Sequence, residues 1–397
     1  MVKRLIFVCN ALDEKTRIQR GISTDSPAAS RKIFMMCSAI RLAKVRPIIL
    51  SLGRGRQNNS GMYFPAFVKR VNGIQVVYAP FIHVPILSQL FSLIAPLWFI
   101  WHFRRLSGKK TILFYNRMPA YTLTLILAFF LRYRTVLDLE DGEITDKSQP
   151  INHLCSLFMR KLFDLMCSGG AMLACSALEK MTSLRPAISY YGCASSSEEV
   201  SVNWLAPIMG VLFGGTLSRV QGSMLLVEAI KLMRKRSESW CQNMIIEVTG
   251  KGDAVEDFLQ LSREAGYPEV RFHGRMTNAE YRSIVSRCHV GLSLKPNAGI
   301  LANTTFPSKV NEIATSGLLV LTTKISDVEI VLGNGALYLT ENTPEVLVKH
   351  FRWIVLNRNA AAKLAYQGRL NVEKKFAPSV VGLFLANILF ESDGYVD

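Results

Sequence analysis

Short apolar runs alternate with amphipathic stretches through the second half of the chain, at a spacing of about 20–25 residues. The apolar runs predict buried strands at 208–213, 244–248, 270–272, 289–294 and 318–322. The amphipathic stretches predict helices at 223–235, 254–265, 278–288 and 307–315. An alternation of this kind is typical of right-handed βαβ units, so it predicts a parallel sheet.

The first half has the same rhythm with longer loops, and predicts strands at 5–9, 47–52, 74–78, 111–115, 135–139 and 171–175. The most polar stretch near the middle is Ser195–Glu199, which indicates an interdomain linker around 190–207. We therefore expect an α/β protein with two Rossmann-like, doubly wound domains that face each other across a cleft. The domains are expected at 1–200 and 201–375, with a C-terminal helix in 376–397 that packs back on the first domain.

Ligands of doubly wound sheets bind at the carboxyl ends of the strands. The loops at these ends are 10–30, 139–147, 214–222, 250–253 and 295–309. They are therefore the candidates for the chemistry of the protein.

One apolar segment of the first half is unusually long and uncharged. Val84 to Trp101 contains 18 residues and no charge, which is the lower edge of membrane-spanning length. Arg104, Arg105, Lys109 and Lys110 follow it, and its apolar stripe at helical spacing consists of Leu87, Leu90, Phe91, Ile94, Leu97, Trp98 and Trp101. Aromatic residues beside a basic cluster favour a helix in the headgroup region of a membrane. A buried core helix and a true span are the alternatives.

The composition adds a strong positive charge. The 397 residues include 47 Lys and Arg against 30 Asp and Glu, so the net charge is +17, while 49% of residues are hydrophobic. A basic and apolar chain points to an anionic partner, either nucleic acid or a membrane surface. The sequence has no basic low-complexity tail, zinc-site spacing or nucleic-acid recognition motif, so we expect an anionic membrane surface and no nucleic acid.

The cysteines indicate a reduced compartment. None of the eight forms a CxxC pair, and no His cluster has metal-ligand spacing, so we expect no metal site. Most lie in apolar runs, which fits a protein of the cytoplasm. The apolar stretch near the N-terminus is about five residues long, shorter than the 7–15 or so of a signal peptide, and we interpret it as a buried first strand.

The strongest local motif spans 304–317 and contains Pro-Ser-Lys-x-x-Glu. Pro307 suits the first position of a helix, since its missing amide costs nothing there. The backbone amides at such a helix start, which includes Ser308, can bind phosphate oxygens, and Lys309 adds a cation. Glu312, one turn on, can accept two hydrogen bonds from a ribose diol. The alternative is a glutamate that stabilises its own helix beside a solvated lysine.

A second candidate anion site is Gly214-Gly215, directly after a predicted strand. Paired glycines let the backbone approach a ligand and lead into a helix N-terminus. Ser218 and Arg219 lie on the same loop and can reach the same phosphates. The sequence contains neither a P-loop nor a GxGxxG fingerprint, and an ordinary tight turn is the alternative.

Clustered carboxylates follow a strand in the first half: Asp138, Glu140, Asp141 and Glu143. Mutual repulsion raises the pKa values of such groups, so they can serve as acid, base or metal ligands. A solvated turn is the alternative.

These motifs bring out a resemblance. Gly214 through Gly222, Gly250-x-Gly252, Val270–Gly274 and Phe306–Gly317 resemble the donor-binding half of retaining glycosyltransferases, the family-4-like bacterial polysaccharide and lipid-glycan enzymes with the GT-B fold. The resemblance covers residues 205–325, and before that only the rhythm is similar. It implies a nucleotide-diphosphate sugar as substrate, held by the C-terminal domain, and no separate cofactor.

On the donor side, the resemblance implies that Glu312 holds the ribose and that the backbone of Arg275 and Met276 contacts the base. Lys309 would neutralise the departing diphosphate. On the other side, Glu140 or Asp141 would lie near the transferred sugar, and these two residues with Lys309 are the expected catalytic groups.

The acceptor side is expected in two loops of the first half. The loop with Arg20 and Gly21 looks like the flexible loop that covers diphosphate or acceptor in the family. Asn116 and Arg117, after another predicted strand, are further acceptor-side candidates.

The chain departs from the family pattern at two places. Thr304 stands where the family often has a second glutamate, and the segment 215–216 and Gln221 stand where an Arg and a Lys commonly clasp the diphosphate. Arg219 is the expected substitute for one cation and Lys309 for the other. Variation within the family is our interpretation of Thr304, and a degraded site is the alternative.

Three functions follow from these features. The first is transfer of a sugar, with retention, to a lipid-linked or polysaccharide acceptor by a cytoplasmic enzyme peripheral to the inner face of the cell membrane. The second is a nucleotide-sugar epimerase on the same fold, which needs no membrane element. The third is a non-catalytic binding subunit that kept the fold and lost the donor site.

Overall fold

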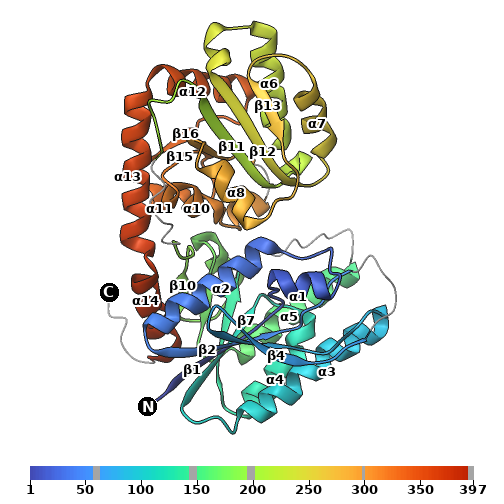
Figure 1. Cartoon of the computed structure of the whole chain (residues 1–397). Helices are drawn as coiled ribbons and strands as arrows, with labels where there is room; N and C mark the ends of the chain where they lie inside the picture. The colour runs from blue at the N-terminus through green and yellow to red at the C-terminus, as the bar shows by residue number, and fades with distance from the viewer. Residues whose placement is uncertain (57–62, 143–149, 195–201, 297–299, 392–397) are drawn as a thin grey trace. The chain divides into compact units, whose positions relative to one another are not determined.

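A computed structural model describes residues 1–56, 63–142, 150–194, 202–296 and 300–391 (Figure 1). The chain forms two compact units: Met1–Cys193 with Pro378–Asp397, and Ala194–Ala377. The second unit thus starts seven residues before the expected 201. The polar stretch Ser195–Glu199 and the carboxylate of Glu143 lie outside the described residues.

The first unit is built on an eight-stranded sheet in the order β10-β9-β8-β7-β1-β2-β5-β4. Only β4, at one edge, runs antiparallel to its neighbour. The strands of the unit, including a separate antiparallel pair β3–β6, are β1 (Lys3–Cys9), β2 (Val45–Ser51), β3 (Tyr63–Phe64), β4 (Phe67–Val71), β5 (Ile74–Tyr78), β6 (Phe81–Ile82), β7 (Lys109–Tyr115), β8 (Arg134–Leu139), β9 (Ala171–Leu173) and β10 (Ala187–Ser189).

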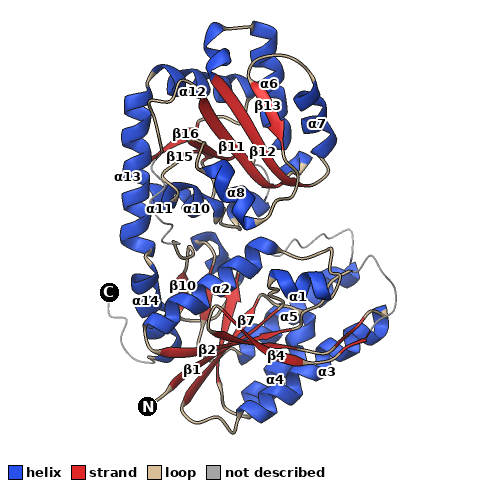
Figure 2. Ribbon diagram, in the orientation of Figure 1, coloured by secondary structure: helices blue, strands red, loops and turns tan. Residues whose placement is uncertain are grey.

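Helices flank this sheet (Figure 2). They are α1 (Glu14–Gln19), α2 (Pro27–Leu42), α3 (Pro85–Phe103), α4 (Thr122–Phe130), α5 (Pro150–Met166) and α14 (Pro378–Phe390), with the 3-10 turns η1 (Pro119–Tyr121) and η2 (Ser176–Met181). The last helix, α14, belongs to this unit and packs against α2, where a Cβ on Gly382 would lie 2.1 Å from the carbonyl oxygen of Ala39. The carbonyl of Leu389 also accepts a 2.7 Å hydrogen bond from the Thr111 hydroxyl.

The second unit has a wholly parallel six-stranded sheet in the order β13-β12-β11-β14-β15-β16. Its strands are β11 (Met209–Thr216), β12 (Met244–Lys251), β13 (Glu269–Phe272), β14 (Val290–Ser293), β15 (Leu319–Thr323) and β16 (Ala336–Leu339). Its helices are α6 (Ser223–Arg236), α7 (Val255–Arg263), α8 (Asn278–Val285), α9 (Ile300–Asn303), α10 (Lys309–Thr315), α11 (Val328–Leu332), α12 (Pro344–Leu356) and α13 (Arg358–Phe376), with 3-10 turns η3 (Arg219–Gln221) and η4 (Ser239–Asn243).

Strand order places the binding edge of this unit. The chain runs outward from β11 to β13 and then returns to β14 on the other side of β11, which is the Rossmann order. The order reverses between β11 and β14, and a doubly wound sheet binds its ligand beside such a reversal, at the carboxyl ends of the strands. The loop after β11 is therefore the loop of this unit where a ligand is most expected.

The expected α/β class with parallel, doubly wound sheets is confirmed, and every strand predicted from the sequence overlaps an observed one. The expectation of a loop over the whole of 10–30 is wrong. That segment contains α1 and the start of α2, capped by the side chains of Asp13 and Ser26. Ser26 with Pro27 at the first position of α2 is an ordinary helix start, and this signal was present in the sequence.

Candidate functional site

Three glycine-containing segments meet at the carboxyl ends of β11, β12 and β13. Register pairs Gly215 with Gly250, and a Cβ on Gly250 would lie 1.9 Å from the carbonyl oxygen of Gly215. The amide of Gly250 in turn donates a 2.7 Å hydrogen bond to the carbonyl of Gly274. The backbones approach so closely because no side chain stands between them. Gly214 and Gly215 are thus held at an edge shared with the segment that leads to Arg275 and Met276.

Lys309 reaches this edge from α10. Its ammonium donates a 2.8 Å hydrogen bond to the carbonyl of Gly214 and lies 5.9 Å from the centre of the Phe213 ring. A Cβ on Gly215 would lie 3.3 Å from the Lys309 nitrogen. Burial lowers the pKa of Lys309, and the negative charge of Glu312 opposes that change. The two strongest motifs of the sequence therefore converge on one cation.

The helix that carries Lys309 starts later than expected. Pro307 was predicted at its first position, but α10 begins at Lys309 with Ser308 as its N-cap residue. The carbonyl of Pro307 accepts a 3.0 Å hydrogen bond from the amide of Val310, so the tight first turn uses the proline as an acceptor. Glu312 lies half-buried in this first turn. With only seven residues in α10, the positive character of the site rests on the lysine side chain.

Thr304 lies buried in the segment just before this turn. Beside it, the ammonium of Lys295 donates a hydrogen bond to the hydroxyl of Thr305, and the carbonyl of Lys295 accepts a 2.6 Å bond from Thr323. Lys295 is not among the residues predicted from the sequence. Its place after β14, one of the strands at the reversal, was the available signal.

Arg219 has a different partner from the one expected. Its guanidinium forms a 2.5 Å ion pair with Asp257 on α7, and its amide donates a 2.7 Å hydrogen bond to Asp253. Asp257 lies in the first turn of α7, where negative charge is stabilised, and Asp253 lies just before the helix. The structure thus gives Arg219 an acidic partner instead of a free position for diphosphate. Ser218 is the N-cap residue of η3 without a side-chain capping bond.

The segment after β13 is accessible. Arg275 is exposed and Met276 is half-buried, directly after Gly274. The next residue, Thr277, begins α8 with a capping box in which Thr277 and Glu280 exchange hydrogen bonds. The backbone of Arg275 and Met276 is therefore fixed on both sides.

In the first unit, two carboxylates at the carboxyl end of β8 lie beside a lysine. The ammonium of Lys32, on α2, contacts Glu140 and lies 3.7 Å from a carboxylate oxygen of Asp138. The backbone of Glu140 donates a 2.7 Å hydrogen bond to the side chain of Asn116. Asp141 is exposed at the next position. Asp138 is buried, so the alternative of a solvated turn is wrong for this residue. Lys32 was not predicted from the sequence.

Arg20 lies in the core, not on an exposed loop. Its guanidinium donates hydrogen bonds of 2.7 and 3.0 Å to the carbonyls of Gly53 and Ala79. It also lies within 5.8 Å of the ring centres of Phe64, Phe67 and Tyr78, so cation–π attraction adds to the hydrogen bonds. The acceptor-side position expected of Arg20 is therefore corrected to a structural one, and Gly21, beside it, provides a turn with φ of +61°.

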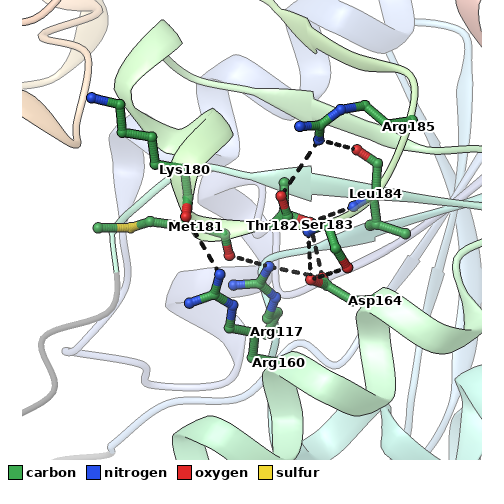
Figure 3. A network of polar contacts seen from close by, with 9 residues as sticks. All are labelled: Arg117, Arg160, Asp164, Lys180, Met181, Thr182, Ser183, Leu184 and Arg185. Carbon is green, nitrogen blue, oxygen red and sulfur yellow. Dashed lines mark hydrogen bonds and ion pairs between the residues drawn. The ribbon is translucent and has the colours of Figure 1, made fainter.

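Arg117 is likewise built into the fold (Figure 3). It donates hydrogen bonds of 3.0 Å to Asp164 and 2.9 Å to the carbonyl of Met181. Asp164 also accepts hydrogen bonds from Thr182 and Ser183 (Figure 3). This buried arginine fastens α5 to the end of η2, so the acceptor-side position expected of Arg117 is corrected to a structural one as well.

The predicted apolar stripe of α3 is on the surface. Leu90 is 47% exposed and Trp98 58% exposed, whereas Ser92 on the opposite side is buried and accepts a 2.7 Å hydrogen bond from Arg54. The alternative of a buried core helix is therefore wrong. Within the described residues, Ile86–Phe103 is the one helix that is long and apolar enough to cross a membrane by length and composition.

The described residues contain no cluster of His, Cys, Asp and Glu side chains with the arrangement of a metal site. The eight cysteines form no disulfide, and Cys155 alone among them is exposed.

Comparison with known proteins gives one family match. Residues 227–380 match the family described as Glycosyl transferase-like. No curated protein matches the chain. The matched segment includes α10 and the segment after β13, which carry residues that the sequence predicts on the donor side.

Solved structures match over nearly the whole chain. HepE of Anabaena in complex with UDP and glucose has a TM-score of 0.67 at 13% identity, over 98% of this chain and 99% of that one. Sucrose-phosphate synthase of Thermosynechococcus elongatus has a TM-score of 0.65 at 12% identity, over 97% and 98%. The trehalose 6-phosphate synthase of Burkholderia multivorans has a TM-score of 0.63 at 10% identity, over 98% and 96%.

These similarities fix the fold. The structural neighbours of this chain have two Rossmann-like domains. The fold of the chain is that of the GT-B glycosyltransferases, as the sequence predicted. The family match and the neighbours together support a glycosyltransferase enzyme.

Proposed function

We propose that this protein is a retaining glycosyltransferase that moves a sugar from a nucleotide-diphosphate sugar to a lipid-linked or polysaccharide acceptor. The observation that carries the proposal is the hydrogen bond from Lys309 to the carbonyl of Gly214. It puts a cation beside the accessible backbone of Gly215, where a diphosphate is best stabilised as negative charge grows on it during transfer. Complexes of a structural neighbour with UDP and UDP-glucose support a uridine diphosphate sugar as donor.

On this proposal the residues divide their work between the two units. In the second unit, Glu312 accepts hydrogen bonds from the ribose, Arg275 and Met276 contact the base through their backbone, and Lys309 neutralises the leaving diphosphate. In the first unit, Glu140 or Asp141 lies near the transferred sugar, and Asn116 positions Glu140 through its backbone. No metal ion or separate cofactor takes part.

The exposed apolar face of α3 favours a membrane-bound acceptor. Leu90, Ile94 and Trp98 are all exposed, and the guanidinium of Arg104 lies 3.6 Å from the centre of the Trp101 ring. A helix with exposed aromatic and aliphatic side chains beside cations binds anionic lipid headgroups. We therefore place the enzyme in the cytoplasm, peripheral to the inner face of the cell membrane, where a lipid-linked acceptor is available.

A donor and product screen tests the proposal. Isothermal titration with uridine and guanosine diphosphates measures donor binding, and product analysis follows incubation of a lipid-linked acceptor with a panel of nucleotide sugars. We expect binding of one diphosphate and transfer with an unchanged anomeric configuration. Binding with epimerisation and no transfer would support the epimerase, and no binding would support a non-catalytic subunit.

A further inference from the structure

A buried lysine lies between two carboxylates in the first unit. Lys32 has 11% of its side chain exposed, Glu140 14% and Asp138 1%. The Lys32 ammonium is in direct contact with Glu140, whereas its distance to the nearer oxygen of Asp138 is 3.7 Å. One cation therefore serves two carboxylates and lies closer to the one at the end of the strand.

The position of Glu140 is fixed from two directions. Its carboxylate contacts Lys32, and its amide is bound by the side-chain oxygen of Asn116 at 2.7 Å. The backbone N–H of Asn116 donates a 2.8 Å hydrogen bond to the carbonyl of Asp138. Asn116 has a positive φ of 57°, a conformation that asparagine tolerates better than most residues. The carboxylate of Glu140 thus has a defined direction at the carboxyl edge of the sheet.

The surroundings of Lys32 are poor in other charges. Burial raises the pKa values of Cys9 on β1, Tyr115 on β7 and Tyr190 after β10, so all three stay neutral at physiological pH. The Lys32 nitrogen lies 5.0 Å from the centre of the Tyr190 ring. Among the described residues, the negative charges that act on Lys32 are those of Glu140, Asp138 and Asp141.

We propose that Lys32 is a positioning residue that keeps Glu140 ionised and correctly directed for sugar transfer, an inference that rests on the function proposed above for Glu140. A carboxylate in a desolvated site takes up a proton unless a cation compensates its charge. Because Lys32 is closer to Glu140, a proton bound by the cluster goes to Asp138, whose pKa burial raises against the opposing effect of Lys32.

Two variants with opposite expected effects test this. Lys32→Met removes the charge and keeps an unbranched side chain, so the pKa of Glu140 should rise by at least about one unit. Asp138→Asn leaves Lys32 to Glu140 alone, so the pKa of Glu140 should fall. Lys32→Arg restores the charge and should return the titration toward that of the wild type. Lys231→Met, at an exposed lysine of α6, is the matched control.

Titration of Glu140 by carbon-13 NMR of the full chain provides a readout that needs no turnover, with Glu140→Gln to assign the signal. A parallel pH profile of kcat/KM should show the acid limb moved upward by the same amount in Lys32→Met, with at least a tenfold loss on that limb. If Lys32 were merely structural, Lys32→Met would lower the melting temperature and leave both the NMR titration of Glu140 and the pH profile of kcat/KM unchanged.

The outcomes separate the two proposals. An unchanged Glu140 titration in both Lys32→Met and Asp138→Asn overturns the role of Lys32, even where the wild type transfers sugar. If Lys32→Met does not fold, Asp138→Asn with an unshifted or raised Glu140 pKa overturns it. The Glu140 pKa can shift as expected in the variants while the wild type transfers no sugar from any donor. That result would contradict the proposed function and still support the electrostatic role of Lys32.

Discussion

The ammonium group of Lys309 and the carbonyl oxygen of Gly214 are joined by a 2.8 Å hydrogen bond across 95 residues of sequence. The bond connects the start of α10 with the end of β11, the strand at the reversal of the Rossmann order. A lysine whose pKa burial lowers is less well solvated than a surface lysine, and so it interacts more strongly with an anion that replaces its water. The first two predictions concern this site.

Glu312→Ala should lower kcat/KM for the donor while the fold stays intact. Loss of two hydrogen bonds from a charged acceptor to a ribose costs about 2–4 kcal/mol, or roughly 30- to 1000-fold. Steady-state kinetics with the accepted nucleotide sugar measures the loss. Glu345→Ala, at an exposed glutamate of α12, is the control. Wild-type kinetics of Glu312→Ala with every donor would remove Glu312 from the site.

Lys309→Ala should reduce kcat more than it weakens donor binding, because charge on the diphosphate is greatest in the transition state. Titration calorimetry and kinetics separate the two effects, with Lys231→Ala as control. The alkaline limb of the wild-type kcat/KM profile should lie below the usual lysine value of about 10.5, since burial lowers the pKa of Lys309 in the free enzyme. Weaker binding with unchanged kcat would make Lys309 a ground-state anchor instead.

Much of the fold could be predicted because buried parallel strands are nearly continuous apolar runs. The run 74–78 coincides with β5. In contrast β4 was missed, because it is an edge strand that alternates exposed residues such as Val68 and Arg70 with half-buried ones, and so lacks that pattern. The exposed stripe of α3 shows the limit of periodicity, which finds an apolar face but cannot tell whether protein or another apolar phase covers it.

Part of the candidate site could be predicted for a topological reason. Gly214 lies at the end of β11 and Lys309 follows β14, and these are the two strands at the reversal, where loops converge whatever the packing in detail. Lys32 could not be found in this way, since it is 108 residues from Glu140 and reaches it from the side of α2. Arg20 and Arg117 were misassigned because a sequence does not reveal which arginines bind backbone carbonyls and buried acids.

Acidification should destabilise the second unit through His289. This buried imidazole accepts a 3.1 Å hydrogen bond from the amide of Gly210 at Nδ1 and donates a 2.8 Å bond from Nε2 to the carbonyl of Asn203, so it fits as the neutral tautomer. Burial lowers the pKa of His289. The unfolded chain therefore binds the proton more readily, and stability present above the unfolded pKa of about 6.5 is lost as the pH falls below it.

Denaturant unfolding at several pH values measures this contribution, whose slope can reach about 1.4 kcal/mol per pH unit. His289→Asn should be less stable than the wild type at pH 7 and lose less further stability between pH 7 and 5. His83→Asn, at a half-buried histidine of the first unit, should keep the wild-type slope. Equal slopes in His289→Asn and the wild type would contradict the assignment.

The exposed face of α3 leads to the last prediction, that the protein binds anionic membranes peripherally. Buried apolar area contributes about 25 cal/mol per Å², so a few Leu and Trp side chains suffice for reversible attachment. Arg104 and Arg105 each add roughly 1 kcal/mol at an anionic surface, a share that should fade as salt rises. Wild-type protein should therefore float with liposomes that contain phosphatidylglycerol at low salt, and less with neutral ones.

Leu90→Glu with Trp98→Glu should abolish flotation at an unchanged melting temperature, because both side chains are exposed before substitution. Leu356→Glu with Tyr366→Glu, at two exposed positions of the second unit, should float as the wild type does and corrects for the added negative charge. Collapse of the melting temperature in the first pair, or wild-type flotation that ignores salt and anionic lipid, would contradict peripheral binding. Wild-type retention on membranes washed with alkaline carbonate would indicate a spanning helix, since only an integral segment resists release once electrostatic attachment is lost.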